Sequence, residues 1–265
     1  MSDRMKITDS RTHGNTCIEL FEYSTLGGNA NISTAQGLYY AEKLGMRLKR
    51  LKITLDGTDE LITEAGALHF MKGDIQMSTP SGGGLGGFMK RAVQGVATGE
   101  SITKPRYSGK GEIWLEPTFG HFLMVEISND TLVADRGAFV CCTGGLEVGV
   151  ARPDDIASGL LSGEGLFQTR ISGTGIVVLQ SPVPFEELEV IEMQNDTLKV
   201  DGNFAFARVG QFTMKIERSS RSLLGSVSSG EGLLQVFRGS GTIWIAPSST
   251  AYDRMHAGVM AMGQK

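Results

Sequence analysis

The sequence is poor in the residue types that most often carry chemistry. Its 265 residues include only three cysteines, four histidines and two tryptophans. The three cysteines lack CxxC spacing, so they predict neither a disulfide framework nor a zinc site. The run FVCC (139–142) is instead typical of a buried strand in a reducing compartment. The histidines lie far apart, without the spacing of metal ligands: His13, His69, His121 and His256.

Long apolar runs and excess positive charge are missing as well. No run approaches the ~18 apolar residues that span a bilayer. Residues 1–16 lack the apolar segment of a signal peptide. The net charge of −4 disfavours general nucleic-acid binding, which requires a cationic surface. We therefore expect a cytoplasmic protein and treat nucleic acid as a disfavoured partner.

Glycine, by contrast, is abundant, with 36 residues and only 7 prolines. This is about twice the usual share of ~7% and suits short strands joined by tight turns. RLKITL (50–55) alternates in polarity, and GHFLMVEI, EIWLE, GIVVLQ and GTIWIA are short runs typical of strands. Helical spacing occurs only over 38–48 and weakly over 85–94. The basic stretch 43–52 is interpreted as a solvated strand or helix face, with a ligand patch as the alternative.

The strongest pattern is an internal repeat. The segments 98–117, 162–182 and 229–247 share a Gly-Glu pair, a second glycine pair and a strand-like run. NDTLVADRGAFVCC (129–142) aligns with NDTLKVDGNFAFAR (195–208), and DELITEAGALHFMK (59–72) is a weaker copy with Leu61, Leu132 and Leu198 in register. The spacing of about 65 residues indicates three copies of one unit.

The repeat predicts an all-β fold in which three tandem β-sandwich-like units surround a pseudo-threefold axis, with few or no helices. We expect one compact body with a 1–44 segment holding the first strands, repeats at 45–120, 121–186 and 187–247, and a tail at 248–265. The tail has the spacing of a weak amphipathic turn, which packs either on the body or on another subunit.

The glycine-rich stretch 81–91 contains a GxGxxG match at Gly82, Gly84 and Gly87. A dinucleotide site also requires a βαβ context, which the flanking residues do not provide. We interpret the stretch as a candidate interaction loop formed by Leu85, Phe88, Met89, Lys90 and Arg91. Apolar residues beside cations suit an anionic membrane or a protein partner. In the alternative, Phe88 and Met89 fold back over the sheet.

The repeated Gly-Glu pairs place one carboxylate in each unit, at Glu100, Glu164 and Glu231. Three carboxylates converging on an axis could bind a cation. We favour the structural interpretation, in which each one accepts backbone hydrogen bonds at an equivalent turn. No G-x-S-x-G elbow occurs, and the acidic cluster at 186–192 is typical of a solvated strand entry. We therefore predict no catalytic residue, no cofactor and no metal.

The ordered motifs resemble those of the altered-inheritance-of-mitochondria family. They are ITEAGALHFMKGDIQM, GGGLGGFMKR, GEIWLEP, RGAFV, SGEGLFQTRISGTG, DGNFAFA and SGEGLLQVFRGSGTIWI, within about residues 45–247. The resemblance implies a triplicated β-sandwich unit similar to the tryptophan RNA-binding attenuation protein fold, and no enzymatic activity is established for the family. Mitochondrial relatives are linked to inner-membrane organisation. This chain has no recognisable transit peptide, so we do not expect that role to carry over.

Together these observations predict a non-enzymatic scaffold or interaction protein with a protein partner or self-association, and with a membrane surface as a further candidate partner. The alternative is a small-ligand or nucleic-acid binding module that uses the triplicated β fold. A third interpretation is an enzyme whose site lies between repeats. Fold analogy alone does not decide among them.

Overall fold

The computed structural model describes residues 4–28, 30–79, 104–151, 168–201, 204–218 and 233–262. The elements in chain order are β1 (Met5–His13), β2 (Thr16–Tyr23), α1 (Ile32–Lys43), β3 (Lys49–Thr63), β4 (Leu68–Ser78), β5 (Arg106–Leu115), β6 (His121–Ala134), β7 (Phe139–Thr143), β8 (Glu147–Ala151), β9 (Gln168–Ser181), the 3₁₀ turn η1 (Phe185–Glu187), β10 (Glu189–Asp201), β11 (Ala205–Arg218), β12 (Leu233–Ile245) and α5 (Ser249–Met262).

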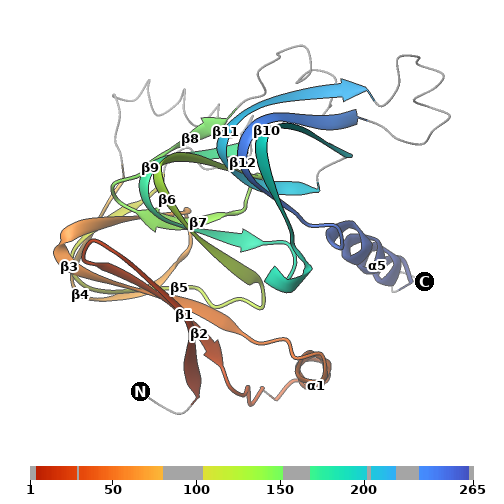
Figure 1. Cartoon of the computed structure of the whole chain (residues 1–265). Helices are drawn as coiled ribbons and strands as arrows, with labels where there is room; N and C mark the ends of the chain where they lie inside the picture. The colour runs from red at the N-terminus through yellow and green to blue at the C-terminus, as the bar shows by residue number, and fades with distance from the viewer. Residues whose placement is uncertain are drawn as a thin grey trace, which may run out of the picture.

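The strands form one large, strongly curved antiparallel sheet (Figure 1). Its order is β1-β2-β3-β7-β9-β6-β11-β12-β10, with β5 also paired to β3, β4 paired to β5, and β8 paired to β9. The first strands lie at one end of the molecule and β10 to β12 at the other. The predicted β fold with few helices is confirmed, since the described residues include only α1, α5 and the short turn η1.

Three long strand pairs share one irregularity. The register of β3–β5 shifts between Asp56 and Glu60, that of β6–β9 between Ile127 and Asp130, and that of β10–β12 between Met193 and Asp196. Glycine is required on the opposite strand at the shift. A Cβ at Gly109 (φ +107°) would lie 2.1 Å from Asp74 O, and one at Gly239 (φ +145°) would lie 1.9 Å from Gln211 O. The Gly-x-Gly motif therefore marks a bend that only glycine permits.

A third strand joins each of these pairs in the same way. β4, β7 and β11 pair with β5, β9 and β12, and each has a register break near its start. One hydrogen bond also recurs, because Glu116 donates to Ala67 O (2.9 Å), Gln180 to Ala138 O (2.7 Å) and Ala246 to Phe204 O (2.8 Å) through their backbone N–H groups. These local features follow the sequence repeat. The rotation about a pseudo-threefold axis stays a prediction.

The core consists of three apolar clusters. One is formed by residues of β2, β3, β4, β5, β7 and β9 and includes Leu51, Leu61 and Ile113. A second fills the middle of the molecule, and a smaller third lies among β10, β11 and β12. Cys141 belongs to the first cluster and its neighbour Cys142 to the second, so β7 is buried on both faces. This confirms the prediction that FVCC is a buried strand.

The helices lie outside the sheet (Figure 1). α1 begins where Asn31 Oδ1 accepts the backbone N–H groups of Ser33 (2.9 Å) and Thr34 (3.3 Å), and Gly45 follows its end at φ +71°. The helix predicted over 38–48 therefore starts and ends earlier. At α5, Tyr252 donates a hydrogen bond to Glu187 of η1 (2.8 Å), which attaches the tail to the body. Neither described helix has the length and hydropathy that a bilayer-spanning segment requires.

Candidate interaction site

The outer edge of β4, opposite β5, is the most unusual surface of the described chain. β4 pairs only with β5 among the described strands. Phe70 and Met71 are each 43% exposed, and Met77 is 55% exposed. Large apolar side chains on an unpaired edge are normally avoided, because such an edge can pair with another chain.

The sheet shows how the strands aligned with β4 are covered. The end of β3 pairs with β7, and the end of β6 pairs with β11; we call each of these contacts a junction. The residue pairs are Leu61–Thr143, Ile62–Cys142 and Thr63–Cys141 in the first junction, and Leu132–Val209, Val133–Arg208 and Ala134–Ala207 in the second. The repeat alignment, anchored on Leu61 and Leu132, carries one set onto the other. The two junctions therefore have the same register.

A hydrogen bond at the end of each junction supports the same correspondence. The backbone N–H of Glu64 donates to Val140 O at 2.8 Å, and that of the aligned Asp135 donates to Phe206 O, also at 2.8 Å. The alignment continues to the third unit, where Asp201 ends β10. The strand of the first unit that aligns with β7 and β11 is β4.

Burial follows these junctions closely. Phe70 aligns with Cys141 and Ala207, and Met71 aligns with Cys142 and Arg208. Cys141 and Cys142 are 0% exposed, in contrast to Phe70 and Met71. β4 is thus a junction strand by alignment, and among the described strands its outer edge has no neighbour.

Phe70 is held in place from beneath. The Arg50 guanidinium lies 4.9 Å from the Phe70 ring centre and 4.7 Å from that of Trp114, while Arg50 itself is buried. Arg50 Nε donates to Leu115 O (3.3 Å), and an Arg50 terminal nitrogen lies 2.7 Å from His69 Nδ1. This layered packing gives the outer edge a fixed shape before any partner arrives. His69 is thereby joined to Arg50, and no other role is assigned to it.

The basic stretch 43–52 does not form one solvated face. Arg50 is buried, and Lys52 Nζ lies 3.2 Å from Glu19 and 3.3 Å from Glu112. Burial acts to lower the pKa of Lys52, but its hydrogen bonds to the two carboxylates raise it above the ordinary value. The interpretation of this stretch as a solvated face is wrong for these two residues, because both are used to join strands.

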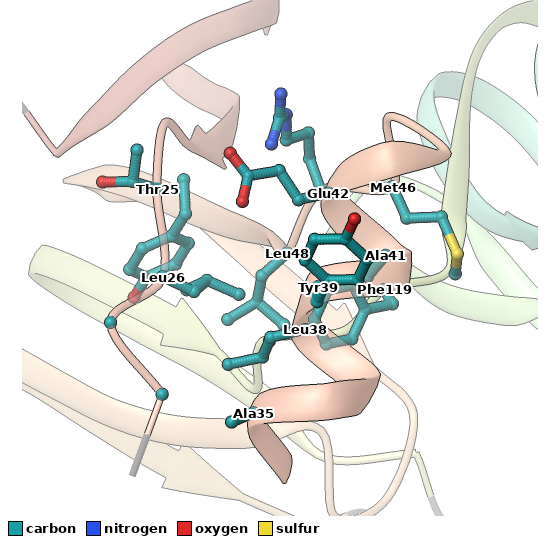
Figure 2. Close-up of a pocket in the computed structure, with 14 residues that line it drawn as sticks. Thr25, Leu26, Ala35, Leu38, Tyr39, Ala41, Glu42, Met46, Leu48 and Phe119 are labelled. Carbon is teal, nitrogen blue, oxygen red and sulfur yellow. The ribbon is translucent and has the colours of Figure 1, made fainter. Parts of the chain in front are cut away.

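A pocket of about 380 Å³ lies between α1, the 25–28 segment and the start of β3 (Figure 2). Leu38, Tyr39, Leu48 and Phe119 form its apolar part, and Glu42 lies on the same helix. The volume falls within the roughly 300–1,000 Å³ of small-ligand sites. The pocket holds one carboxylate and no group of metal ligands among the described residues.

Asp135, at the end of the second junction, has the most perturbed pKa of the described carboxyl groups. Burial raises its pKa to about 6, while a hydrogen bond donated by Gln168 (2.8 Å) and the charge of Arg208 act in the opposite direction. Arg208 also donates to Gln168 Oε1 at 2.8 Å. The three side chains form a polar link across the junction. No nucleophile takes part in it within the described hydrogen bonds, so we assign it to folding.

The site residues predicted from the sequence lie outside the described residues. These are the loop residues Leu85, Phe88, Met89, Lys90 and Arg91 and the repeated glutamates Glu100, Glu164 and Glu231. Their roles stay predictions. The β4 edge was not predicted from the sequence, although a signal was present in the weakest repeat copy. That copy has a Phe-Met pair where the second has Cys-Cys and the third has Ala-Arg.

The fold and the site define an antiparallel β protein in which, among the described strands, the outer edge of β4 is unpaired and carries bulky apolar side chains. The model of the family described as "Mitochondrial biogenesis AIM24" matches residues 41–248. The chain therefore belongs to this family, which confirms the resemblance found in its motifs.

The chain is also similar to two Streptococcus pyogenes proteins. An uncharacterised protein of Streptococcus pyogenes serotype M6 is 25% identical over 209 residues, which cover 76% of this chain and 82% of that protein. A crystal structure of a Streptococcus pyogenes protein matches with a TM-score of 0.56 and 21% identity, covering 75% of this chain and 88% of that one. The structural match supports the fold alone.

Proposed function

We propose that this chain is a non-enzymatic interaction protein that binds a polypeptide in extended conformation along the outer edge of β4. The observation that carries the proposal is the contrast in burial between aligned strands. Phe70 and Met71 are 43% exposed where Cys141 and Cys142 are fully buried. A partner strand would cover these side chains and would pair with the outward backbone groups of β4.

The packing beneath β4 supports this function. Phe70 stacks on Trp114 with ring centres 5.7 Å apart, and Arg50 lies against both rings. A preformed edge loses little conformational freedom when a partner binds, which favours affinity. The exposed apolar side chains would supply the buried area.

Site-specific photo-cross-linking in cells that express the chain tests the proposal. Benzoylphenylalanine replaces Lys72, which is exposed on β4, and in a control chain it replaces the exposed Phe185 of η1. We expect a discrete polypeptide adduct at position 72 and none at position 185. Met71→Pro in the same chain should abolish the adduct, because proline cannot donate a hydrogen bond at the edge. Equal adducts at both positions, or none at position 72, would refute the proposal.

The pocket beside α1 favours a second candidate, the binding of a small apolar ligand. Its volume and its apolar lining by Leu38, Leu48 and Phe119 support this candidate. The dye 8-anilinonaphthalene-1-sulfonate serves as a probe. Leu38→Trp fills the pocket and should remove the dye fluorescence seen with the wild-type chain. Unchanged fluorescence in the variant would eliminate the pocket as the binding site.

A further inference from the structure

We infer that the strand that covers the outer edge of β4 is β10 of a second copy of this chain. The pairing would place Leu198 opposite Lys72, Lys199 opposite Met71 and Val200 opposite Phe70. The inference rests on the proposed function, since it names the polypeptide that β4 binds.

The register comes from the two junctions inside the chain. In each of them, the end of the first strand of one unit pairs with the strand that follows its counterpart in the next unit. In the first junction, β3 of the first unit pairs with β7 of the second unit. In the second junction, β6 of the second unit pairs with β11 of the third unit. By the same pattern, β10 of the third unit would pair with a strand equivalent to β7 and β11. Within the repeat, that strand is β4.

Two residues at the end of β10 are more exposed than the aligned residues of the two junctions, as expected for a strand that has not been paired. Leu198 is half-buried, whereas the aligned Leu61 and Leu132 are completely buried at their junctions. Lys199 is exposed, whereas the aligned Ile62 and Val133 are buried. Val200 is already buried within the chain, as are the aligned Thr63 and Ala134. Both halves of a third junction are therefore present, and Leu198 and Lys199 on one half and Phe70 and Met71 on the other lack the cover of most of their counterparts.

The two halves are not joined within one chain. Among the described strands β10 pairs only with β12 and β4 only with β5, and β10 to β12 lie at the far end of the molecule from the first strands (Figure 1). A junction between copies would connect two different surfaces, head to tail. Such contacts build a ring when the rotation closes and a filament when it does not.

The hydrogen bonds of the first junction show which backbone groups would pair. Gly144 N–H donates to Glu60 O (2.7 Å) and Glu64 N–H donates to Val140 O (2.8 Å), so the intervening pair Ile62–Cys142 is also of the hydrogen-bonded type. Lys199 and Met71 take these places in the third junction. Proline at either position removes a hydrogen bond between copies and leaves the bonds to β12 or β5 in place.

Mass measurement of purified chains tests the inference. We expect the wild-type chain to form assemblies of several copies, and Met71→Pro and Lys199→Pro each to have the mass of one chain, 28.4 kDa. An equimolar mixture of the two variants should have twice that mass, because it retains one intact β10 and one intact β4. Unchanged far-UV circular dichroism of each variant excludes loss of the fold.

Disulfide trapping provides a second test that does not depend on proline. Lys72 and Leu198 would form a non-hydrogen-bonded pair, whose short Cα separation suits a disulfide. In a Cys17→Ser background, chains carrying Lys72→Cys and chains carrying Leu198→Cys are mixed and oxidised. We expect a disulfide that joins two chains in the mixture, and none when Lys72→Cys is oxidised alone.

Two results of the mass and disulfide measurements would overturn the inference. One is a wild-type chain that stays at 28.4 kDa over the whole concentration range. The other is a disulfide within one chain when Lys72→Cys and Leu198→Cys are combined, since it would mean that the chain closes on itself. A cross-link from position 72 to an unrelated polypeptide would refute the self-association and leave the proposed function intact. Absence of any cross-link would refute both.

Discussion

β7 and β4 occupy aligned places in the repeat, yet one lies in the middle of the sheet and the other at its edge. β7 pairs with both β3 and β9, and its two cysteines are completely buried. β4 pairs only with β5 among the described strands and exposes Phe70 and Met71. The difference shows that burial in this fold depends on whether a junction is made, and not on the place of a strand within its unit.

The side chains differ in the same way. The joined strand uses small side chains at the contact, Cys141 and Cys142, and the unjoined strand uses Phe70 and Met71. Small residues let two strands and the cores on either side pack closely. A bulky aromatic and a flexible thioether instead suit a surface that meets a partner arriving from outside.

The largest expected effect is the difference in stability loss between Leu132, which lies at a junction, and the aligned Leu198 of β10, which does not. Leu132→Ala should lower the free energy of unfolding by roughly 2–5 kcal/mol, because it leaves a cavity at a completely buried junction position. Leu198→Ala, at the half-buried aligned position, should cost about 1 kcal/mol or less in the single-chain state. Urea unfolding of both variants in the Lys199→Pro background measures the difference. Equal losses would mean that Leu198 is already covered within the chain.

The second prediction concerns the acid at the end of the second junction. Burial raises the pKa of folded Asp135 to about 6, above that of the unfolded chain. Its contribution to stability is thus fully present below pH ~4 and is lost as the pH rises through about 6. Asp135→Asn should match the wild type at pH 4 and exceed it by about 2–3 kcal/mol at pH 8. The exposed Asp201, aligned at the end of β10, provides the matched control Asp201→Asn.

Unfolding curves of both Asn variants from pH 4 to pH 8 make this measurement. Asparagine keeps an oxygen for the hydrogen bond from Gln168, so packing at the junction changes little. A difference between Asp135→Asn and wild type that does not vary with pH would contradict the prediction. A pH-dependent gain of equal size in Asp201→Asn would show that the effect does not come from the junction.

The smallest expected effect compares serine on the two aligned strands. Cys142→Ser should destabilise the chain by about 1–3 kcal/mol, because it places a hydroxyl in an apolar core. Met71→Ser should change the free energy of unfolding of the single chain by less than about 0.5 kcal/mol, as for other exposed positions. Thermal unfolding in the Lys199→Pro background distinguishes the two. A large loss from Met71→Ser would indicate that β4 is covered after all.

The sequence predicted the predominance of strands well, because apolar alternation and Gly-x-Gly bends are local signals; the threefold repeat stays a prediction. It did not predict the extent of α1, whose start depends on the Asn31 side chain capping the first turn. The sequence also did not indicate that the Arg50 side chain is buried, because a cation in an alternating strand normally faces solvent. Its burial depends on Phe70 and Trp114, which reach it only after β3, β4 and β5 have paired.

The β4 edge could not be recognised from the sequence for a related reason. His-Phe-Met has the composition of an interior strand, and the aligned residues of the second unit are indeed interior. Whether such a strand is covered depends on which neighbour reaches it across long stretches of chain. That is a property of the assembled sheet, and no local pattern in the sequence encodes it.

The burial of the adjacent cysteines Cys141 and Cys142 has a practical consequence for the kinetics of thiol labelling. Burial raises the pKa of Cys142 to about 12 and also raises that of Cys141, so neither thiol reacts in the closed sheet. Cys17, in the N-terminal hairpin, is partly accessible. A maleimide would therefore label Cys17 rapidly. The slow rate of labelling at Cys141 and Cys142 would report how frequently β3 and β7 separate.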